Sequence, residues 1–321
     1  MSKATVAVYA CGGAATNILK KLPVEPGEGM AELKRYFIDT SNSNMRNSNI
    51  NAEEVFLFEG VDGSGKVRSE NHDLISKNTL KILQDFKPTT FSVVTHSASG
   101  GSGAIIGGSL VAELKKRGEQ VVVILIGSTN SQIEIENTLK TLKSYDAIAD
   151  KSNSPVVVHY LENSAEHSRS SIDSAATRAL FALLALFSGE NDELDTADLR
   201  NWMKHSKLRN ELVSLHFCMS DEAYQAAGTV VTVATLAKHD SNTALSPLPA
   251  YQAVGFVAGL GDSSFIGDEP IHFTISSDLI TTSAKALNAK LKESDARLNS
   301  SVRRESLVDR HDNQTDSGII L

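Results

Sequence analysis

Apolar residues in the first half of the chain gather in short runs, which are separated by polar, glycine-containing stretches. Runs rich in Val, Ile, Tyr and Phe and bounded by Gly, Ser, Asn or Pro are typical of strands buried on both faces. Such runs are TVAVYA (5–10), YFID (36–39), VFLF (55–58), TFSVVTH (90–96), VVVILIG (121–127) and VVVHYL (156–161). Helix-length stretches lie between several of them, at 17–22, 69–86, 104–117 and 134–143. This alternation predicts an α/β fold with a parallel sheet, whose ligands bind at the carboxyl ends of the strands.

The pattern changes in the second half of the chain. The segment 171–187, SIDSAATRALFALLALF, is apolar nearly all round its carboxyl half, which predicts a long helix buried between two layers. Residues 278–307 contain no Pro or Gly and repeat apolar residues at spacings of three, four or seven, so we expect a long amphipathic helix there. Between the two helices, a second and smaller α/β domain is indicated by strand-like runs at 228–236, 251–260 and 270–276.

The composition is that of an ordinary globular protein. The chain has 321 residues, of which 41% are hydrophobic and 22% charged, so it can form two domains with buried cores. A net charge of −8 argues against a nucleic-acid surface, and two cysteines are too few for a disulfide framework. The longest apolar run, 179–187, is too short to span a bilayer, and the first residues lack the apolar core of a signal peptide. We therefore expect a soluble cytoplasmic protein with no membrane and no direct nucleic-acid partner.

The stretch FLFEGVDGSGKVRSE, residues 56–70, begins like the nucleotide loop of a P-loop kinase. Gly60 is followed after four residues by Gly65 and Lys66. A P-loop requires a hydroxyl directly after the lysine to hold Mg²⁺, and Val67 stands there. The segment also follows the third predicted strand, whereas a P-loop normally follows the first. A P-loop phosphotransferase that uses Lys66 remains one hypothesis.

Two glycine-containing turns follow predicted strands. In CGGAATN (11–17), Gly12 and Gly13 allow a tight turn into a helix whose amino end can face an anion, although a plain turn fits the pattern equally well. The turn lacks the third glycine of the dinucleotide fingerprint, so an NAD-dependent enzyme is a distant hypothesis. The second turn, SASGGSGAIIGG (97–108), places only small residues from Ser99 to Gly103, so that consecutive N–H groups can approach phosphate oxygens. A flexible surface loop is the alternative interpretation.

A pair of acids follows the predicted buried helix. In ELDTADLRNWM (193–203), Asp195 and Asp198 are three residues apart, so both carboxylates lie near the first turn of a helix if one begins there. A helix cap explains one of them equally well, because free N–H groups and the helix dipole favour Asp at a helix start.

In their order along the chain, these features resemble the tubulin and FtsZ superfamily of polymerising GTPases. SASGGSGAIIG is similar to the glycine-rich box of the phage-encoded tubulins, ELDTADLR is similar to the family's acid loop, and the long terminal helix with an acidic tail resembles the phage spindle proteins. The resemblance implies five parts. They are a GTP-binding domain (1–170), a central core helix (171–190), a catalytic loop with a second, activation domain (191–275), a C-terminal helix (276–308) and an acidic tail (309–321).

The resemblance also implies a GTP site, residue by residue. Asn17 contacts the guanine, Asn163 approaches the ribose side, and Asp173, which precedes Asp195 by twenty-two residues, reads the guanine. A carboxylate there accepts two N–H bonds from guanine and rejects adenine. The remaining implied residues are Gly12 and Gly13 in the first loop, Asp39 and Thr40 in the second, Gly63, Ser64, Gly65 and Lys66 in a third loop that senses the γ-phosphate, and Ser99, Gly100, Gly101, Ser102, Gly103 and Ala104 in the phosphate box.

The resemblance implies that Asp195 and Asp198 complete the GTP site of the next subunit, so that hydrolysis with Mg²⁺ requires head-to-tail assembly into a filament. The partner is then another copy of the chain, and the cargo is a phage DNA compartment or capsids in the host cytoplasm. Segregation of plasmid or phage DNA is the alternative, as is a filament subunit that binds nucleotide without hydrolysing it. Three residues depart from the family pattern: Ser99 stands where many relatives have glycine or alanine, Ala104 replaces a hydroxyl residue, and Ile105 replaces a glycine. Lys66 and Arg68 add positive charge beside the third loop, and this charge either binds the γ-phosphate or is simply solvated. The tail acids Asp309, Asp312 and Asp316 either contact a neighbouring subunit, as the resemblance suggests, or belong to a disordered end.

Overall fold

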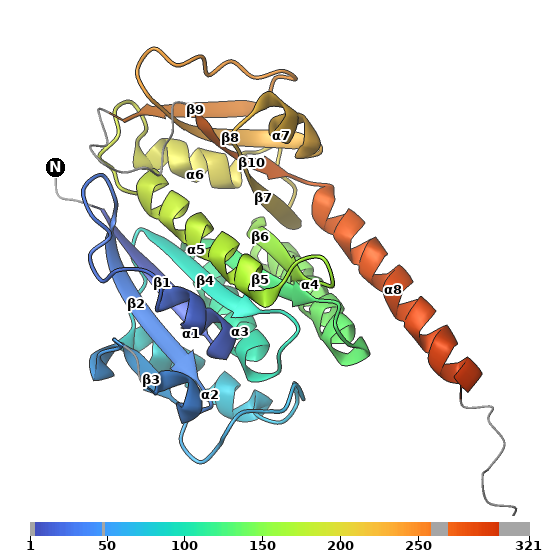
Figure 1. Ribbon diagram of the computed structural model, residues 1–321. Helices are drawn as coiled ribbons and strands as arrows, with labels where there is room; N and C mark the ends of the chain where they lie inside the picture. The colour runs from blue at the N-terminus through green and yellow to red at the C-terminus, as the bar shows by residue number, and fades with distance from the viewer. Residues whose placement is uncertain (1–3, 47–48, 258–268, 302–321) are drawn as a thin grey trace, which may run out of the picture.

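The computed structural model describes residues 4–46, 49–257 and 269–301. Its centre is one hydrogen-bonded sheet of ten strands in the order β3-β2-β1-β4-β5-β6-β7-β10-β8-β9 (Figure 1). The strands are β1 (Thr5–Cys11), β2 (Glu32–Asp39), β3 (Val55–Leu57), β4 (Phe91–Ser97), β5 (Gln120–Ser128), β6 (Val156–Asn163), β7 (Leu212–Cys218), β8 (Val230–Ala237), β9 (Tyr251–Phe256) and β10 (Ile271–Ser276). In the order of the sheet, all neighbouring strands from β3 through β2, β1, β4, β5 and β6 to β7 pair in parallel, whereas β10 is antiparallel to both of its neighbours.

Helices cover both faces of the parallel part of the sheet, which is why its strands are apolar on both sides. Side chains alternate along β1, so that Val6 and Val8 join one buried cluster with α1 and α5 while Ala7 and Tyr9 join another with α2, α3, α4 and α8. The helices are α1 (Gly13–Leu19), α2 (His72–Asp85), α3 (Ser102–Lys116), α4 (Gln132–Ser152), α5 (Arg169–Leu186), α6 (Thr196–Lys204), α7 (Asp221–Ala226) and α8 (Leu279–Ser301), with short 3-10 turns η1 (Asn42–Met45) and η2 (Ala52–Glu54).

α5 is the buried central helix that the sequence predicts at 171–187. Its start is fixed by Ser168, whose hydroxyl accepts a hydrogen bond from the Ser171 backbone N–H. Residues from Ala182 to Phe187 are all buried, because the carboxyl half of the helix shares one apolar cluster with residues of the sheet and of α6. Figure 1 shows α5 running along the length of the parallel sheet.

The bounds of several elements differ from the sequence prediction. The first helix begins at Gly13 rather than at residue 17, and α4 continues nine residues beyond 143, to Ser152. α4 continues because Tyr145 and Ala149 keep its apolar face buried, and it ends at Asn153, which adopts a left-handed conformation (φ 48°). β7 was not predicted; its run LVSLHFC mixes apolar and polar residues.

The second half of the chain also departs in detail from the expected layout. β8, β9 and β10 extend the same sheet as the parallel strands, and the proposed division into domains stays a prediction. α8 agrees with the expected C-terminal helix as far as residue 301. The rest of that helix, the acidic tail with Asp309, Asp312 and Asp316, and residues 258–260 of the run at 251–260 lie outside the described residues.

Within residues 4–46, 49–257 and 269–301, none of the helices combines the length and the apolar character that crossing a bilayer requires.

Two histidines of the central strands are held neutral by their surroundings. His96 on β4 is fully buried; its Nδ1 donates to the Ser97 carbonyl at 3.1 Å and its Nε2 meets the Tyr145 hydroxyl. His159 on β6 donates from Nδ1 to the Leu215 carbonyl at 3.0 Å. Burial lowers the pKa of each imidazole to about 4, because desolvation disfavours the charged ring.

We therefore expect the folded state to lose stability in mild acid. The unfolded chain binds protons at these histidines below about pH 6.5, whereas the folded chain does so only near pH 4, so stability falls as the pH falls between these values. Each histidine accounts for about 2 kcal/mol between pH 7.5 and pH 5. Urea unfolding at the two pH values measures the loss.

The variant His159→Gln tests the assignment, since glutamine keeps a donor for Leu215 but does not titrate. The free energy of unfolding should differ between pH 7.5 and pH 5 by about 2 kcal/mol less in this variant than in wild type, whatever the stability of the variant at pH 7.5. The control His72→Gln, at the exposed first residue of α2, should leave the pH dependence of the stability unchanged. An equal pH dependence in wild type and His159→Gln would contradict the assignment.

Candidate functional site

The sequence-predicted binding residues converge on one cavity at the carboxyl ends of the parallel strands. This cavity, here called the glycine cavity, has a volume of about 360 Å³. Fifteen of the seventeen predicted residues line it: Gly12, Gly13, Asn17, Asp39, Thr40, Gly63, Ser64, Lys66, Ser99, Gly100, Gly101, Ser102, Gly103, Asn163 and Asp173. Gly65 and Ala104 do not line it. Gly65 is exposed in the loop before α2, and Ala104 is buried on the side of α3 that faces away from the cavity, toward Arg68.

The floor of the glycine cavity is made by two backbone segments in close contact. Gly12, at φ 82°, lies so near Gly103 that a Cβ on Gly12 would be 3.0 Å from the Gly103 Cα. A Cβ on Gly103 would be 2.7 Å from the Cys11 carbonyl oxygen. The turn after β1 and the box after β4 are therefore in direct contact, at two positions that only glycine permits.

The loop at residues 60–66, here called the Lys66 loop, covers the amino end of α3. The Ser102 N–H donates to the Ser64 hydroxyl at 2.9 Å, and a Cβ on Gly101 would be 2.0 Å from the Ser64 Oγ. Asn71, which the sequence analysis missed, donates to the Gly63 carbonyl at 2.7 Å and to the Ser102 hydroxyl at 3.1 Å. The free N–H groups and the positive end of the α3 dipole favour an anion at this position.

Charged side chains near the Lys66 loop are paired in different ways. Lys66 forms an ion pair with Glu134 on α4, with 2.9 Å between Nζ and Oε1. Burial raises the pKa of Glu134, but hydrogen bonds from Lys66, Ser131 and Ser128 outweigh it and leave the pKa below its usual value. Arg68 neither faces the cavity nor lies in solvent: its guanidinium donates to the Asn137 carbonyl and the Thr141 hydroxyl at 3.0 and 2.6 Å.

Asp39 organises the loop after β2. Its Oδ1 accepts from the Thr40 and Ser41 N–H groups at 2.7 and 3.2 Å, and its Oδ2 accepts from the Asn44 amide at 2.8 Å. Burial raises its pKa, and these hydrogen bonds oppose the rise. Two cavity-lining oxygens remain buried without a hydrogen-bond partner among the described residues, Thr40 Oγ1 and Asn163 Oδ1. Such atoms need a partner from solvent or a ligand.

A polar part of the cavity wall comes from α1 and α5. Asn17, Asp173 and Arg169 line it together. The Asp173 Oδ2 lies 3.7 Å from the Lys21 Nζ, at the carboxyl end of α1. Arg169, Asn44 and Glu134 are cavity residues that sequence reasoning missed, because each belongs to a loop or helix start with no motif of its own.

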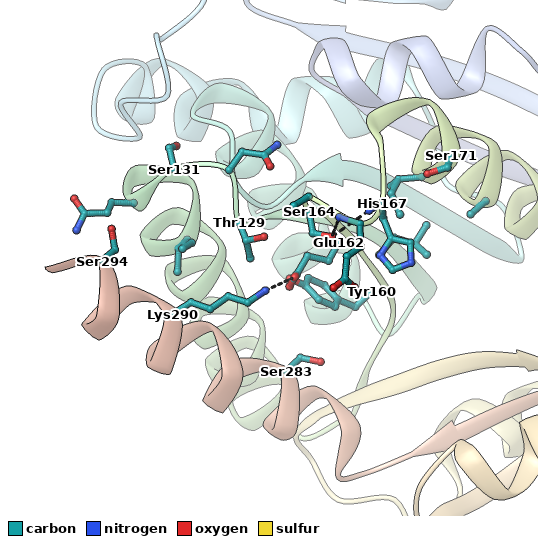
Figure 2. A pocket seen from close by; sticks show the side chains of 18 of the residues that line it. Thr129, Ser131, Tyr160, Glu162, Ser164, His167, Ser171, Ser283, Lys290 and Ser294 are labelled. Carbon is teal, nitrogen blue, oxygen red and sulfur yellow. Dashed lines mark hydrogen bonds and ion pairs between the residues drawn. The ribbon is translucent and has the colours of Figure 1, made fainter. Parts of the chain in front are cut away.

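A larger hollow, of about 1140 Å³, lies between α8 and the body of the protein. Figure 2 shows Lys290 on α8 reaching across it to Glu162, at 3.3 Å between Nζ and Oε1, beside Tyr160. None of the predicted binding residues lines this hollow, and its walls lack the two glycine segments. The smaller glycine cavity is therefore the better candidate for an anionic ligand.

The acid pair Asp195 and Asp198 lies far from the glycine cavity. Asp195 caps α6, with its Oδ1 accepting from the Ala197 and Asp198 N–H groups at 2.7 and 2.9 Å, and the Asp198 Oδ2 accepts from the Asp195 N–H at 3.2 Å. The predicted cap therefore exists. α5 separates the two sites: its first turns line the cavity, and its other end precedes the acid pair at the amino end of β1, where the Ala4 N–H donates to the Ser188 carbonyl. With 18 residues, α5 is about 27 Å long.

The chain is similar to known proteins over its whole length, although no family model matches it. It is 29% identical over 325 residues to a phage tubulin-like protein of Pseudomonas phage PhiPA3, covering all of both chains. It is 28% identical over 336 residues to one of Pseudomonas phage phiKZ, covering all of this chain and 99% of the relative.

Solved structures give the same result. The protofilament of TubZ from bacteriophage PhiKZ matches with a TM-score of 0.80 and 27% identity, over 98% of each chain. The phage tubulin PhuZ with GDP shares the fold at a TM-score of 0.84 and 23% identity, over 98% of this chain and 99% of PhuZ. In sequence and in fold, the chain is thus similar over its whole length to phage tubulin-like proteins of the tubulin and FtsZ superfamily.

Proposed function

We propose that this protein is a GTPase that polymerises head to tail into dynamic filaments, and that the acid pair of each subunit completes the GTP site of its neighbour. The observation that carries the proposal is the position of the glycine cavity and the acid pair at opposite ends of α5. Because α5 is buried and about 27 Å long, one subunit cannot bring its own acids to its own cavity.

Each carboxylate that lines the cavity is engaged by groups of its own subunit. Asp39 accepts hydrogen bonds within its own loop, Glu134 is paired with Lys66, and Asp173 is paired with Lys21. A general base must reach the proton that it removes, and we propose that the group that does so comes from outside the subunit. The exposed acid loop of a second copy supplies such a group.

A contact between the two ends of the molecule joins two different surfaces. Such a heterologous contact does not close on itself and generates a filament. Two of the similar solved structures are a protofilament of TubZ and a filament of PhuZ201, which supports this mode of assembly. Loss of the γ-phosphate would weaken the contact and make the filament ends dynamic.

For the nucleotide, we propose that the phosphates occupy the glycine segments and the amino end of α3, with guanine between Asn17 and Asp173. The PhuZ structure with GDP is consistent with a guanine nucleotide. Among the described residues, no cluster of three or more His, Cys, Asp or Glu could hold a metal ion. We propose that Mg²⁺ enters with the nucleotide and is held mainly by phosphate oxygens and water, as is usual for this ion.

The P-loop phosphotransferase hypothesis gains no support. In a P-loop the lysine opens a helix, whereas α2 begins at His72, six residues after Lys66. For the cellular role, we propose a spindle that positions phage DNA compartments or capsids in the host cytoplasm. That role rests on the phage source of the relatives, which is equally compatible with segregation of plasmid or phage DNA.

Hydrolysis should depend on assembly and on the acid pair. With GTP and Mg²⁺, light scattering and pelleting should show polymer only above a critical concentration, and phosphate release should begin at the same concentration. Asp195→Asn keeps the helix cap but removes the carboxylate, so it should lower phosphate release at least ~100-fold and give polymers that persist. Removal of Mg²⁺ with EDTA should stop the release.

The matched control is Asp192→Asn, which removes a nearby carboxylate that pairs with His239 instead of capping α6. It should hydrolyse GTP at the wild-type rate per polymerised subunit. Phosphate release that is proportional to protein concentration from nanomolar upward would contradict the proposal. Polymer without any phosphate release would indicate a filament subunit that binds nucleotide without hydrolysing it.

Asp173 should determine the preference for guanine. Asp173→Asn replaces one acceptor oxygen by a donor, so the affinity of the monomer for GTP should fall roughly 30-fold. The weak affinity for ATP should not fall by the same factor. Isothermal titration calorimetry measures both. Lys21→Met, which removes the ion-pair partner but leaves the carboxylate, is the control and should keep the preference for GTP. Parallel losses for both nucleotides in Asp173→Asn would argue against base recognition.

Lys66 should contribute to binding of the γ-phosphate. Lys66→Met should weaken GTP about 10-fold more than GDP, because an ammonium–phosphate bond is charge-assisted. Glu134→Gln should do the reverse and favour GTP, since it releases Lys66 from its ion pair. The exposed pair of Lys140 and Glu136 on the same helix provides the control Lys140→Met, with no expected effect. Equal changes in GTP and GDP affinity for Lys66→Met would refute this role.

A further inference from the structure

A tyrosine from a neighbouring strand fixes the acid pair. The Tyr251 hydroxyl donates to the Asp198 Oδ1 at 2.8 Å. We infer that Tyr251 is a positioning residue, which holds the Asp198 carboxylate in the orientation that completes the GTP site of the next subunit. The inference rests on the proposed function and adds a residue that no motif in the sequence indicates.

Each oxygen of Asp198 has its own donor. Oδ1 accepts from Tyr251, and Oδ2 accepts from the Asp195 N–H at 3.2 Å. Two donors from different parts of the chain fix the plane of the carboxylate. Each oxygen keeps a second lone pair, so the fixed carboxylate can still accept a proton or a hydrogen bond from water.

Asp195 is held differently. Its Oδ1 accepts from two backbone N–H groups of α6, while its Oδ2 has no hydrogen-bond partner within the described residues. The cap therefore fixes Asp195 without any help from the tyrosine. Removal of the tyrosine hydroxyl should consequently release Asp198 alone and leave the start of α6 intact.

Tyr251 is itself well anchored. It begins β9, where it pairs with Thr232 of β8, and its ring stacks on His205 at the end of α6, with 5.5 Å between ring centroids and 24° between planes. Tyr251 thus contacts both ends of α6, with its ring on His205 and its hydroxyl on Asp198. Burial and the bond to Asp198 raise the pKa of Tyr251 to about 12, so the hydroxyl stays protonated and donates at neutral pH.

A positioned carboxylate is catalytically better than a mobile one, because small displacements of a reacting group carry large penalties in rate. The bond between Tyr251 and Asp198 lies within one subunit, so it exists before assembly. Each subunit would then bring an acid pair that is already oriented to the interface. The tyrosine should accordingly affect turnover in the polymer rather than nucleotide binding by the monomer.

The test is Tyr251→Phe, which removes the hydroxyl and retains the ring on His205. Phosphate release per polymerised subunit should fall roughly 10-fold. The critical concentration and the GTP affinity of the monomer should stay at wild-type values. The control is Tyr224→Phe, in α7. It removes a hydroxyl that donates to the Pro247 carbonyl at 2.6 Å and does not contact the acid pair. It should hydrolyse GTP as wild type does.

A double variant separates positioning from general damage to the fold. Asp198→Asn alone and Asp198→Asn with Tyr251→Phe should release phosphate at the same rate, because the tyrosine acts only through Asp198. If the two losses multiply, or if Tyr251→Phe hydrolyses at the wild-type rate, the inference is wrong while the proposed function stands. If wild type forms no polymer or releases no phosphate, the proposed function fails, and the role of Tyr251 in hydrolysis fails with it.

Discussion

The burial of one helix, α5, sets the distance on which the proposed chemistry depends. Its carboxyl half packs against the sheet and α6, where Phe187 stacks on Phe91 with 4.3 Å between ring centroids and also lies near Trp202. Fully burying a large apolar side chain contributes about 1.5–3 kcal/mol, so several such residues hold the helix firmly. The two functional ends of the molecule are therefore kept apart by the hydrophobic core rather than by a flexible linker.

At one end of α5, the cavity is built mostly from backbone. Gly12 and Gly103 approach too closely for a side chain on either, and the Lys66 loop lies directly on Gly101. This arrangement exposes N–H groups at the start of α3 to an anion while the hydroxyls of Ser64 and Ser102 are engaged by the protein itself.

At the other end, the same side chains serve stability and the proposed chemistry. The acid pair caps α6 and is still open to a neighbouring subunit, because Asp195 is exposed and Asp198 is only half-buried. The structural and functional interpretations of Asp195 and Asp198 are thus compatible, because a cap uses only some of the lone pairs of the two carboxylates. The bond from Tyr251 adds a second element, β9, to the support of this loop.

Three features could be predicted from the sequence: the alternation of strands and helices, the buried helix, and the loops that meet at the carboxyl edge of the sheet. Apolar periodicity and glycine-rich turns are local signals, and parallel strands bring their carboxyl ends together. The contacts between side chains of different elements became visible in the three-dimensional structure alone. It excluded Gly65 and Ala104 from the cavity wall, paired Lys66 with Glu134, and joined Tyr251 to Asp198 across 53 residues of chain. Such contacts depend on how elements far apart in the sequence pack together. They therefore produce no hydrophobic periodicity in either of the two segments that meet.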